Sequence, residues 1–310
     1  MARIPTGEWL QSKFGRLVDM TEVVAKEYPG EFSEPEYGFW SIKKEIALMY
    51  WIWPFLQIAK EYFTAFYYID LFAGSGLMKA GSDFFVGSPI VAIGSTLPDS
   101  KFSQYICFET DERRKTALEK RTAIASEYFG TSKPIILNED CNDGIDRVLA
   151  EYCPIENACY LAFVDPQRIT DLRWSTLEKL LTHCKGDLII NFPTSGVNRN
   201  LPIADCVKAL TDFFGDAGWR EITGDIDAIV EYYKNKVALV RVDGRPRMVN
   251  SLPVLDENHR RLYDLIFATG STGMKNALND LKGRLESIRT KDIREIYKVI
   301  AGSQKQLTGY

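Results

Sequence analysis

The sequence predicts an α/β fold in which a doubly wound, mostly parallel sheet of seven strands ends in an antiparallel strand. Two observations support this prediction. Short apolar runs alternate with helical patterns through the middle of the chain, which is typical of strands buried on both faces of a parallel sheet. Two further apolar runs near the carboxyl terminus are joined by a short turn, and only an antiparallel pair tolerates so short a connection.

Bulk composition favours a folded, enzyme-sized protein. The chain has 310 residues, of which 45% are hydrophobic and 26% charged, and its net charge is −4, so a general positive field for nucleic acid is not indicated. The most apolar run, residues 46–59, contains Pro54 and is too short to span a bilayer. The six cysteines form no C-x-x-C pair, so neither a zinc site nor a disulfide framework is indicated. We expect a reduced, cytoplasmic protein without metal or membrane contact.

Two helices precede the sheet. Apolar residues recur at helical spacing from Gly7 to about Tyr28, and a Pro/Gly/Glu-rich stretch then breaks the pattern. Ser41 is expected to cap a second helix, bent at Pro54. Residues 1–62 are therefore assigned to an N-terminal helical extension. Lys43 and Lys44 within it are interpreted as solvated helix residues, with contact to a ligand as the alternative.

The predicted strands define the main domain. Five of them are parallel and two form the closing hairpin: Phe66–Phe72, Tyr105–Phe108, Ile135–Leu137, Tyr160–Val164, Asp187–Phe192, Met248–Val254 and Leu262–Thr269. They assign residues 63–194 and 248–272 to a Rossmann-like domain, 195–247 to a helical insertion or substrate subdomain, and 273–310 to a basic, helical C-terminal segment. The arrangement resembles class I methyltransferases.

The strongest local signal is the run Ile69-Asp70-Leu71-Phe72-Ala73-Gly74-Ser75-Gly76, an apolar strand that enters a Gly-rich turn. The two glycines permit close approach of a ligand to the backbone. A dinucleotide fingerprint would place a third glycine where the chain has Lys79, so we favour S-adenosylmethionine over a nicotinamide cofactor. The predicted cofactor residues here are Asp70, Phe72, Ala73, Gly74, Ser75 and Gly76. A purely structural turn is the alternative.

Two further strand ends carry acidic residues. Glu109, followed by Thr110, ends the second strand and is expected to accept the ribose hydroxyls, with a solvated carboxylate as the alternative. The stretch from Lys79 to Gly87 is interpreted as a loop insertion, after which Ser88 is expected to cap the delayed helix, with Pro89 in its first turn. Asp140 and Cys141 follow the third strand and, like Glu109 and Thr110, are predicted cofactor residues. The Asp140 carboxylate is expected at the adenine amino group, with an ordinary turn as the alternative.

The acceptor side is predicted at the fourth and fifth strands. Asp165-Pro166-Gln167-Arg168 follows the fourth strand, and Asp165 with the Pro166 backbone is expected to hold an acceptor amine. An N-cap of the next helix is the alternative for Asp165. Gln167, Arg168, Asn191 and Pro193 are candidate substrate residues, the last two also explicable as a structural turn.

These motifs resemble those of the three-Cys-motif partner proteins (TcmP). The elements that carry the resemblance span about residues 40–170: the Lys-bearing helix at 40–44, the Gly-rich turn, Gly87-Ser88-Pro89, Phe108-Glu109, Asp140-Cys141-Asn142 and Phe163-Val164-Asp165-Pro166. The resemblance implies a methyltransferase-like fold and a partner protein that bears three cysteines and is radical-SAM-like. Gln167-Arg168 departs from the Asp-Pro-aromatic-Gly pattern that the resemblance implies.

Three functional hypotheses follow. The first is S-adenosylmethionine-dependent methyl transfer to a nucleic acid, the acceptor class being suggested by the basic residues of the last quarter of the chain. The second is a non-catalytic methyltransferase-like scaffold for a three-Cys-motif protein, suggested by the altered Gln167-Arg168. The third is a nucleotide-dependent oxidoreductase, suggested by the Gly-rich turn alone.

Overall fold

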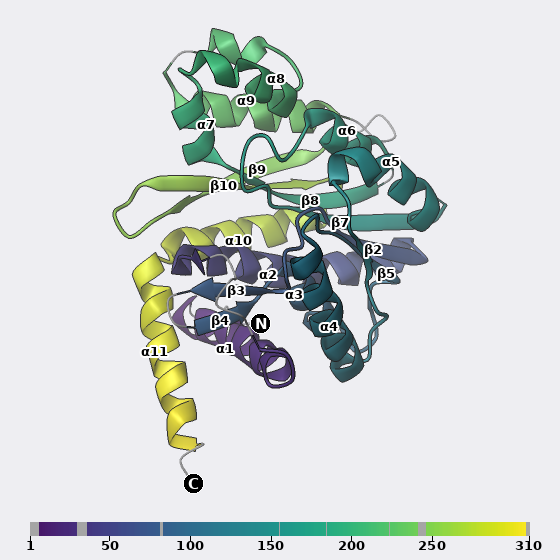
Figure 1. Ribbon diagram of the computed structural model, residues 1–310, viewed down its shortest axis with the longest axis vertical. Coiled ribbons are helices and arrows are strands. Elements are labelled where there is room, and N and C mark those ends of the chain that lie inside the picture. Colours follow the sequence, from purple (N-terminus) through teal and green to yellow (C-terminus); the bar gives the residue numbers. More distant parts are fainter. Residues whose placement is uncertain are drawn as a thin grey trace.

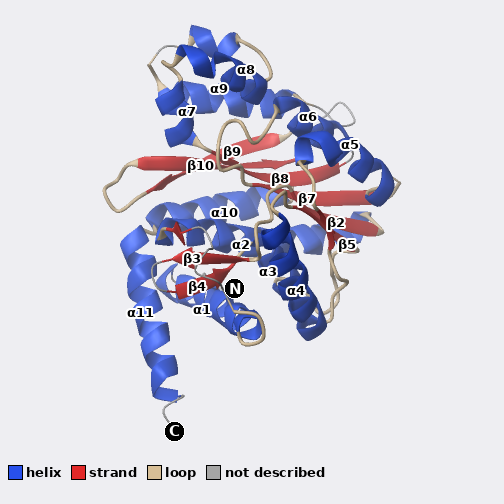
Figure 2. Ribbon diagram, in the orientation of Figure 1, coloured by secondary structure: helices blue, strands red, loops and turns tan. Residues whose placement is uncertain are grey.

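The structure is a computed structural model. It describes residues 6–29, 36–80, 83–154, 156–183, 185–222, 224–240 and 246–307. Its centre is a seven-stranded sheet with the order β6-β5-β2-β7-β8-β10-β9 (Figures 1 and 2). The strands are β2 (Ala65–Asp70), β5 (Gln104–Phe108), β6 (Ile135–Leu137), β7 (Ala158–Val164), β8 (Lys185–Phe192), β9 (Met248–Leu255) and β10 (Arg261–Thr269). The first five pair in parallel, and β10 is antiparallel to both β8 and β9.

The predicted fold class is confirmed by this topology. Starting from β2, the chain moves outward to β5 and β6 and then returns to the other side of β2 with β7. The order reverses between β2 and β7, and ligands of open α/β sheets bind beyond the carboxyl ends of the strands at such a reversal. The antiparallel β10 inserted between β8 and β9 gives the class I methyltransferase-like variant of the Rossmann fold.

Helices cover both faces of the sheet. They are α1 (Thr6–Ala25), α2 (Ile42–Tyr62), α3 (Ser88–Gly94), α4 (Glu112–Phe129), α5 (Cys141–Tyr152), α6 (Trp174–His183), α7 (Thr194–Asn200), α8 (Val207–Phe214), α9 (Ile226–Leu239), α10 (Met274–Ser287) and α11 (Thr290–Leu307). Three short 3-10 helices join them: η1 (Phe39–Ser41), η2 (Ala204–Cys206) and η3 (Gly218–Glu221). Figure 1 shows α7, α8 and α9 beyond one face, and α1, α2 and α10 beyond the other.

Two large apolar cores result, one on each face, beside a small cluster of Ala73, Cys107 and Leu118. Strand β7 shows how the sheet divides them, because alternate side chains of a strand point to opposite faces. Cys159, Leu161 and Phe163 belong to the core under α1, α2, α3 and α10. Tyr160 and Ala162 belong to the core under α5, α6, α8 and α9. All of these side chains are buried, so the sheet carries apolar residues on both faces as predicted.

The stretch predicted as a loop insertion is instead a β-hairpin. Strands β3 (Leu77–Ala80) and β4 (Asp83–Val86) pair antiparallel, and β1 (Glu36–Tyr37) pairs with β3 to form a separate three-stranded sheet. The hairpin brings the chain back to the Gly-rich turn from which it left, since Gly87 N donates to Gly76 O at 2.9 Å. Helix α3 therefore begins beside the Gly-rich turn despite the insertion.

Two predicted caps are wrong. Gly87, in an extended conformation, is the N-cap of α3, and Ser88 is its first helical residue. Ser41 precedes α2 with helical dihedral angles and makes no side-chain capping bond, because η1 runs directly into α2. Pro54 lies inside α2.

Candidate functional site

The Gly-rich turn lies at the carboxyl end of β2. Gly74 and Gly76 have φ angles of +62° and +82°, which side-chain-bearing residues rarely adopt. A Cβ atom on Gly76 would lie 3.1 Å from Leu118 Cδ1, whereas nothing lies within 4 Å of a Cβ on Gly74. Gly76 is thus packed against α4, and the open side of the turn is at Gly74, between half-buried Phe72 and buried Ser75.

Arg121 of α4 holds this turn in place. Its guanidinium is fully buried, and Nη1 donates to Ser75 O at 2.8 Å. Nη2 donates to Pro29 O at 3.0 Å, and the guanidinium carbon lies 5.2 Å from the Tyr28 ring centroid. The turn is therefore tied to both α4 and the segment after α1, although its sequence carries no signal for either contact.

Asp70 supports the turn from below. It is fully buried, and its Oδ1 accepts from Phe72 N at 3.1 Å while Oδ2 accepts from the Tyr68 hydroxyl at 2.9 Å. Burial raises the pKa of Asp70 to about 6, against hydrogen bonds from Ser88, Tyr68 and Phe72 N that lower it. Because both of its carboxylate oxygens accept hydrogen bonds from the protein itself, Asp70 stabilises the conformation of the turn. Ala73 is also buried, and its N donates to Phe108 O at 3.0 Å.

Glu109 is placed at the end of β5, next to the turn. It is 7% exposed, and its Oε1 accepts from Asp111 N at 2.8 Å. Arg114 Nε lies 3.7 Å from the same oxygen. Asn138 Nδ2 donates to the carbonyls of Glu109 and Thr110, which fixes the backbone there while Thr110 stays exposed. The carboxylate of Glu109 is therefore buried and oriented, in contrast to the solvated strand-end carboxylate that was the alternative interpretation.

Asp140 is the N-cap of α5. Its Oδ1 accepts from the backbone N and the side-chain amide of Asn142, both at 2.8 Å, and its side chain is exposed. Cys141 is buried beneath it. Asn142 extends this network, because its Nδ2 donates to Asp171 O and its Oδ1 accepts from Arg173 N. The turn role is thus present, and a contact with adenine stays a prediction for the exposed side of Asp140.

Asp165 is the centre of a buried polar cluster at the end of β7. Lys44 Nζ lies 2.5 Å from its Oδ2, and Asn191 Nδ2 lies 2.5 Å from its Oδ1. The side chains of Lys44 and Asp165 are 6% and 13% exposed. Lys44 also lies 5.5 Å from the ring centroid of buried Tyr263. Asp165 does not cap a helix, because α6 begins only at Trp174.

Among the described residues, two buried oxygens of this cluster make no hydrogen bond. They are Asn191 Oδ1 and Glu45 Oε2. Glu45 is 4% exposed, and burial raises its pKa well above the usual range, with Asp165 and Asp70 adding to the shift and Lys44 opposing it. The cluster thus combines three carboxyl groups with one ammonium, and the neutral form of Glu45 reduces the repulsion between them.

The remaining predicted acceptor residues lie around Asp165. Pro166 is buried, whereas Gln167 and Arg168 are exposed. Arg168 is held in its own loop, because its N and Nε donate to the carboxylate of Asp171. Pro193 is buried at the start of α7, two residues after Asn191.

The interpretation of Lys43 and Lys44 as solvated helix residues is wrong. Both are buried, and Lys43 Nζ donates to Ile288 O. Helical spacing in the sequence shows which residues share a face, yet α2 is buried nearly all round at its N-terminus, so even its polar positions face protein. The N-terminal extension therefore contributes Lys44 and Glu45 to the site, and two consecutive lysines before a glutamate in an apolar helix were the available signal.

A large cavity lies elsewhere. It has a volume of about 960 Å³ and is lined by the first residues of β7 and β8, at the opposite edge of the sheet from Asp70 and Asp165. In the part of the chain that the structure describes, no group of three His, Cys, Asp or Glu side chains is arranged to hold a metal ion. The described helices include none with the length and apolar character needed to cross a membrane.

Comparison with known proteins gives structural likeness only. No family model matches the chain, and no curated protein matches its sequence. A DUF519 protein from Legionella pneumophila is 12% identical, with 79% of this chain and 90% of that chain covered and a TM-score of 0.47. An O-methyltransferase from Bacillus cereus, in complex with SAH, is 11% identical over 83% and 90% of the two chains, with a TM-score of 0.42. The O-methyltransferase TomG from Streptomyces achromogenes, in complex with SAM, is 10% identical over 82% and 90%, again with a TM-score of 0.42. At these values the likenesses identify neither a substrate nor a site residue for this chain.

Proposed function

We propose that the protein is an S-adenosylmethionine-dependent methyltransferase. The observation that carries this proposal is the position of the Gly74–Gly76 turn and of Glu109 at the carboxyl edge of β2 and β5, beside the point where the strand order reverses. The classic dinucleotide-binding sheet has six strands in a mostly parallel order, whereas here a seventh strand, β10, is inserted antiparallel between β8 and β9. This departure supports methyl transfer over the oxidoreductase hypothesis.

The cofactor is expected to lie across the turn and the end of β5. Its amino-acid portion would contact the backbone of the turn at Gly74, where there is open space. The carboxylate of Glu109 is buried and already oriented by Asp111 N, so its second oxygen is suited to accept a ribose hydroxyl. Asp140, exposed at the start of α5, is the candidate contact for the adenine amino group.

The acceptor is expected to be an amine beside Asp165. Lys44 donates to this carboxylate, and Asn191 fixes its rotamer. A carboxylate held in a fixed orientation can orient an N–H donor toward a sulfonium methyl group. Most of the rate acceleration would come from this alignment, because the sulfonium ion is already a reactive methyl donor.

Calorimetric titration with S-adenosylmethionine and S-adenosylhomocysteine tests the cofactor assignment. The wild-type protein should bind both, and Glu109→Ala should weaken binding by about 1–3 kcal/mol because the ribose hydroxyls lose their partner. Glu112→Ala is the matched control, since this exposed glutamate lies three residues further on in the first turn of α4. Equal affinities in the wild type and Glu109→Ala would remove Glu109 from the site.

The acceptor class we propose is a nucleic acid base. The support is the basic C-terminal segment, although several of its cations are paired, such as Arg289 with Asp292 and Arg294 with Glu257. Affinity for tRNA or DNA should fall steeply as salt rises from 50 to 200 mM, because released counterions drive such binding. Binding that does not respond to salt would point to a protein or small-molecule acceptor instead.

The second candidate function is a non-catalytic, methyltransferase-like scaffold for a three-Cys-motif partner protein. The observation that favours it is that both oxygens of Asp165 are already bonded, to Lys44 and Asn191, so an acceptor must displace or share a protein donor. Incubation of the purified protein with S-adenosylmethionine carrying a labelled methyl group and with tRNA, DNA or protein separates the two. Transfer of label excludes the scaffold, and binding of cofactor with no transfer supports it.

A further inference from the structure

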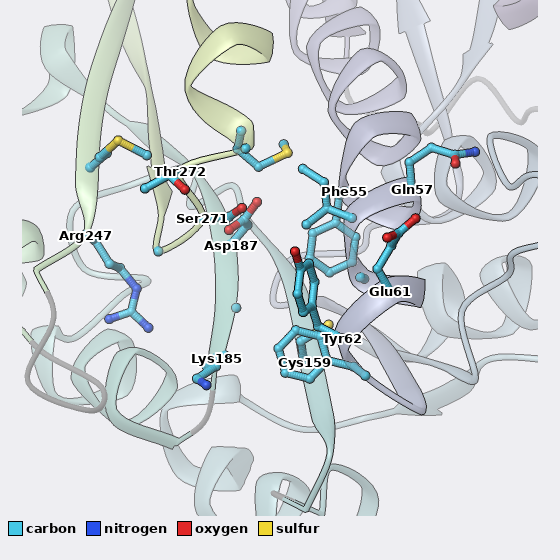
Figure 3. A pocket seen from close by; sticks show the side chains of 18 of the residues that line it. Phe55, Gln57, Glu61, Tyr62, Cys159, Lys185, Asp187, Arg247, Ser271 and Thr272 are labelled. Carbon is cyan, nitrogen blue, oxygen red and sulfur yellow. The ribbon is translucent and has the colours of Figure 1, made fainter.

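The cavity at the amino-terminal edge of the sheet has two chemically different walls (Figure 3). One wall is the last two turns of α2, with Phe55, Ile58 and Tyr62. The other is formed by the start of β8, the residues that lead into β9, and the link between β10 and α10. Its volume of about 960 Å³ is at the upper end of the range for small-molecule sites. The strand register places it at the edge opposite to Asp70, Glu109 and Asp165.

The second wall contains a buried arginine that forms no ion pair with any described residue. Arg247 lines the cavity, yet only 6% of its surface is exposed. Its Nη1 donates to Val240 O at 3.1 Å, and its Nε is buried without a hydrogen bond. No carboxylate of the described residues lies within ion-pair distance of its guanidinium. Arginine stays charged in proteins, so burying it without a counter-ion costs free energy.

Asp187 compensates this charge only at longer range. Its carboxylate accepts from Trp51 Nε1 at 3.0 Å and from the Thr269 hydroxyl. Burial raises the pKa of Asp187 to about 6, and the positive charge of Arg247 acts against this rise. Asp187 is committed to Trp51 and Thr269, and Arg247 lines the cavity with its Nε lacking a hydrogen bond among the described residues, so the guanidinium is suited to pair with an acidic ligand. A guanidinium can make two parallel bonds to a carboxylate or phosphate group.

We propose that this cavity is a second binding site, for a small organic anion whose acidic group pairs with Arg247 and whose flat apolar body lies against Phe55, Ile58 and Tyr62. The cavity is distinct from the proposed cofactor site, and the proposal does not depend on methyl transfer. Ser271 and Thr272, which belong to the second wall in the link between β10 and α10, supply hydroxyl donors for the remaining oxygens of the anion. The site thereby combines one fixed charge with an aromatic surface, as small-molecule sites commonly do.

The probes are 2-naphthoate, 2-naphthyl phosphate and the uncharged 2-naphthalenemethanol, titrated calorimetrically into the full chain at pH 7.5. We expect saturable 1:1 binding of at least one of the anions and at least tenfold weaker binding of the alcohol. Preference for the carboxylate or for the phosphate identifies which acidic group the site takes. Saturating S-adenosylhomocysteine should leave the affinity unchanged, and competition would overturn the proposal by placing the probe at the other edge of the sheet.

Variants test each wall separately. Arg247→Met should weaken anion binding at least tenfold and leave the alcohol unaffected, whereas Arg220→Met removes an exposed charge elsewhere and should change nothing. Asp187→Asn should strengthen anion binding about three- to tenfold, because it removes the negative charge that faces Arg247. A gain of affinity cannot result from misfolding, so this variant keeps the test decisive if Arg247→Met is unstable.

The apolar wall has its own matched pair. Tyr62 is 73% exposed at the rim, so Tyr62→Ala should fold normally and lower the affinity for the naphthyl anions several-fold. Tyr128, 67% exposed on α4, gives the control Tyr128→Ala. Equal binding of the alcohol and the anions, or no binding of either anion, overturns the proposal.

Discussion

Replacing Lys44 with methionine should destabilise the protein by about 3–5 kcal/mol. Lys44 Nζ and Asp165 Oδ2 are 2.5 Å apart, and their side chains are only 6% and 13% exposed. At an effective dielectric constant of about 20, this distance corresponds to a gross attraction of roughly 6–7 kcal/mol. Desolvation of the two charges cancels part of that attraction, and removal of one partner leaves Asp165 as an uncompensated buried charge.

The chain contains a matched control for burial. Lys208 and Asp212 are also 2.5 Å apart, but their side chains are 86% and 44% exposed. Lys208→Met should therefore cost only about 0.3–0.5 kcal/mol, as is usual for exposed pairs four residues apart in a helix. The two variants differ in burial and not in distance, so their difference measures what the environment contributes.

The measurement is the free energy of unfolding in guanidinium chloride for the wild type, both lysine variants, Asp165→Asn and the double variant Lys44→Met/Asp165→Asn. The double variant should recover part of the loss, because it leaves no charge unpaired. A loss of 1 kcal/mol or less for Lys44→Met, with additive effects in the double variant, would refute the buried ion pair.

Three further predictions concern the turn and the core. Gly76→Ala should lower the free energy of unfolding by about 1–3 kcal/mol, because φ at this residue is +82° and the new methyl group would meet Leu118 of α4. The same variant should weaken S-adenosylmethionine binding in calorimetry. The control Gly15→Ala, whose methyl group would lie in open space on α1, should be neutral or stabilising. The pKa of Asp70 is raised to about 6 in the folded protein from an ordinary value of 3.8, so its contribution to stability is full below pH ~4 and is lost as the pH rises through 6. Asp70→Asn should remove up to ~3 kcal/mol of that decline in denaturation curves at pH 4 and pH 8, and an unchanged pH dependence would contradict the assignment. Tyr160→Phe should cost about 1–2 kcal/mol in the same assay, because the buried hydroxyl donates at 2.6 Å to a carbonyl of α6 that would lose its partner; a smaller loss would mean that water reaches this carbonyl.

The fold was predictable because its determinants are local. Apolar runs of strand length separated by helical patterns indicate buried parallel strands, and the short Asp256-Glu257-Asn258 turn leaves β9 and β10 no choice but to pair antiparallel. The hairpin β3–β4 was not predicted, since each of its strands has only four residues, and the third strand of its sheet, β1, comes from a segment far earlier in the sequence.

The cofactor side of the site was likewise accessible from sequence. Gly74, Gly76 and Glu109 immediately follow strands, and parallel strands bring their carboxyl ends to one edge of the sheet. Because each of these residues directly follows a strand, their positions in the sequence predict that they lie near one another in the fold. Asp140 shows the limit of this reasoning, because the same position serves as the N-cap of α5.

The sequence by itself determined which residues form the strands of the sheet, where the Gly-rich turn lies, and which carboxylates follow the strand ends. The tertiary structure alone decided which distant groups meet them. Lys44 comes from a helix that precedes the sheet, yet it pairs with Asp165 across 121 positions, and Arg121 fixes the turn from α4. The physical reason is that strand and turn patterns arise from neighbouring residues, whereas the charge state of a buried carboxylate depends on whatever side chain the folded chain brings within a few ångströms.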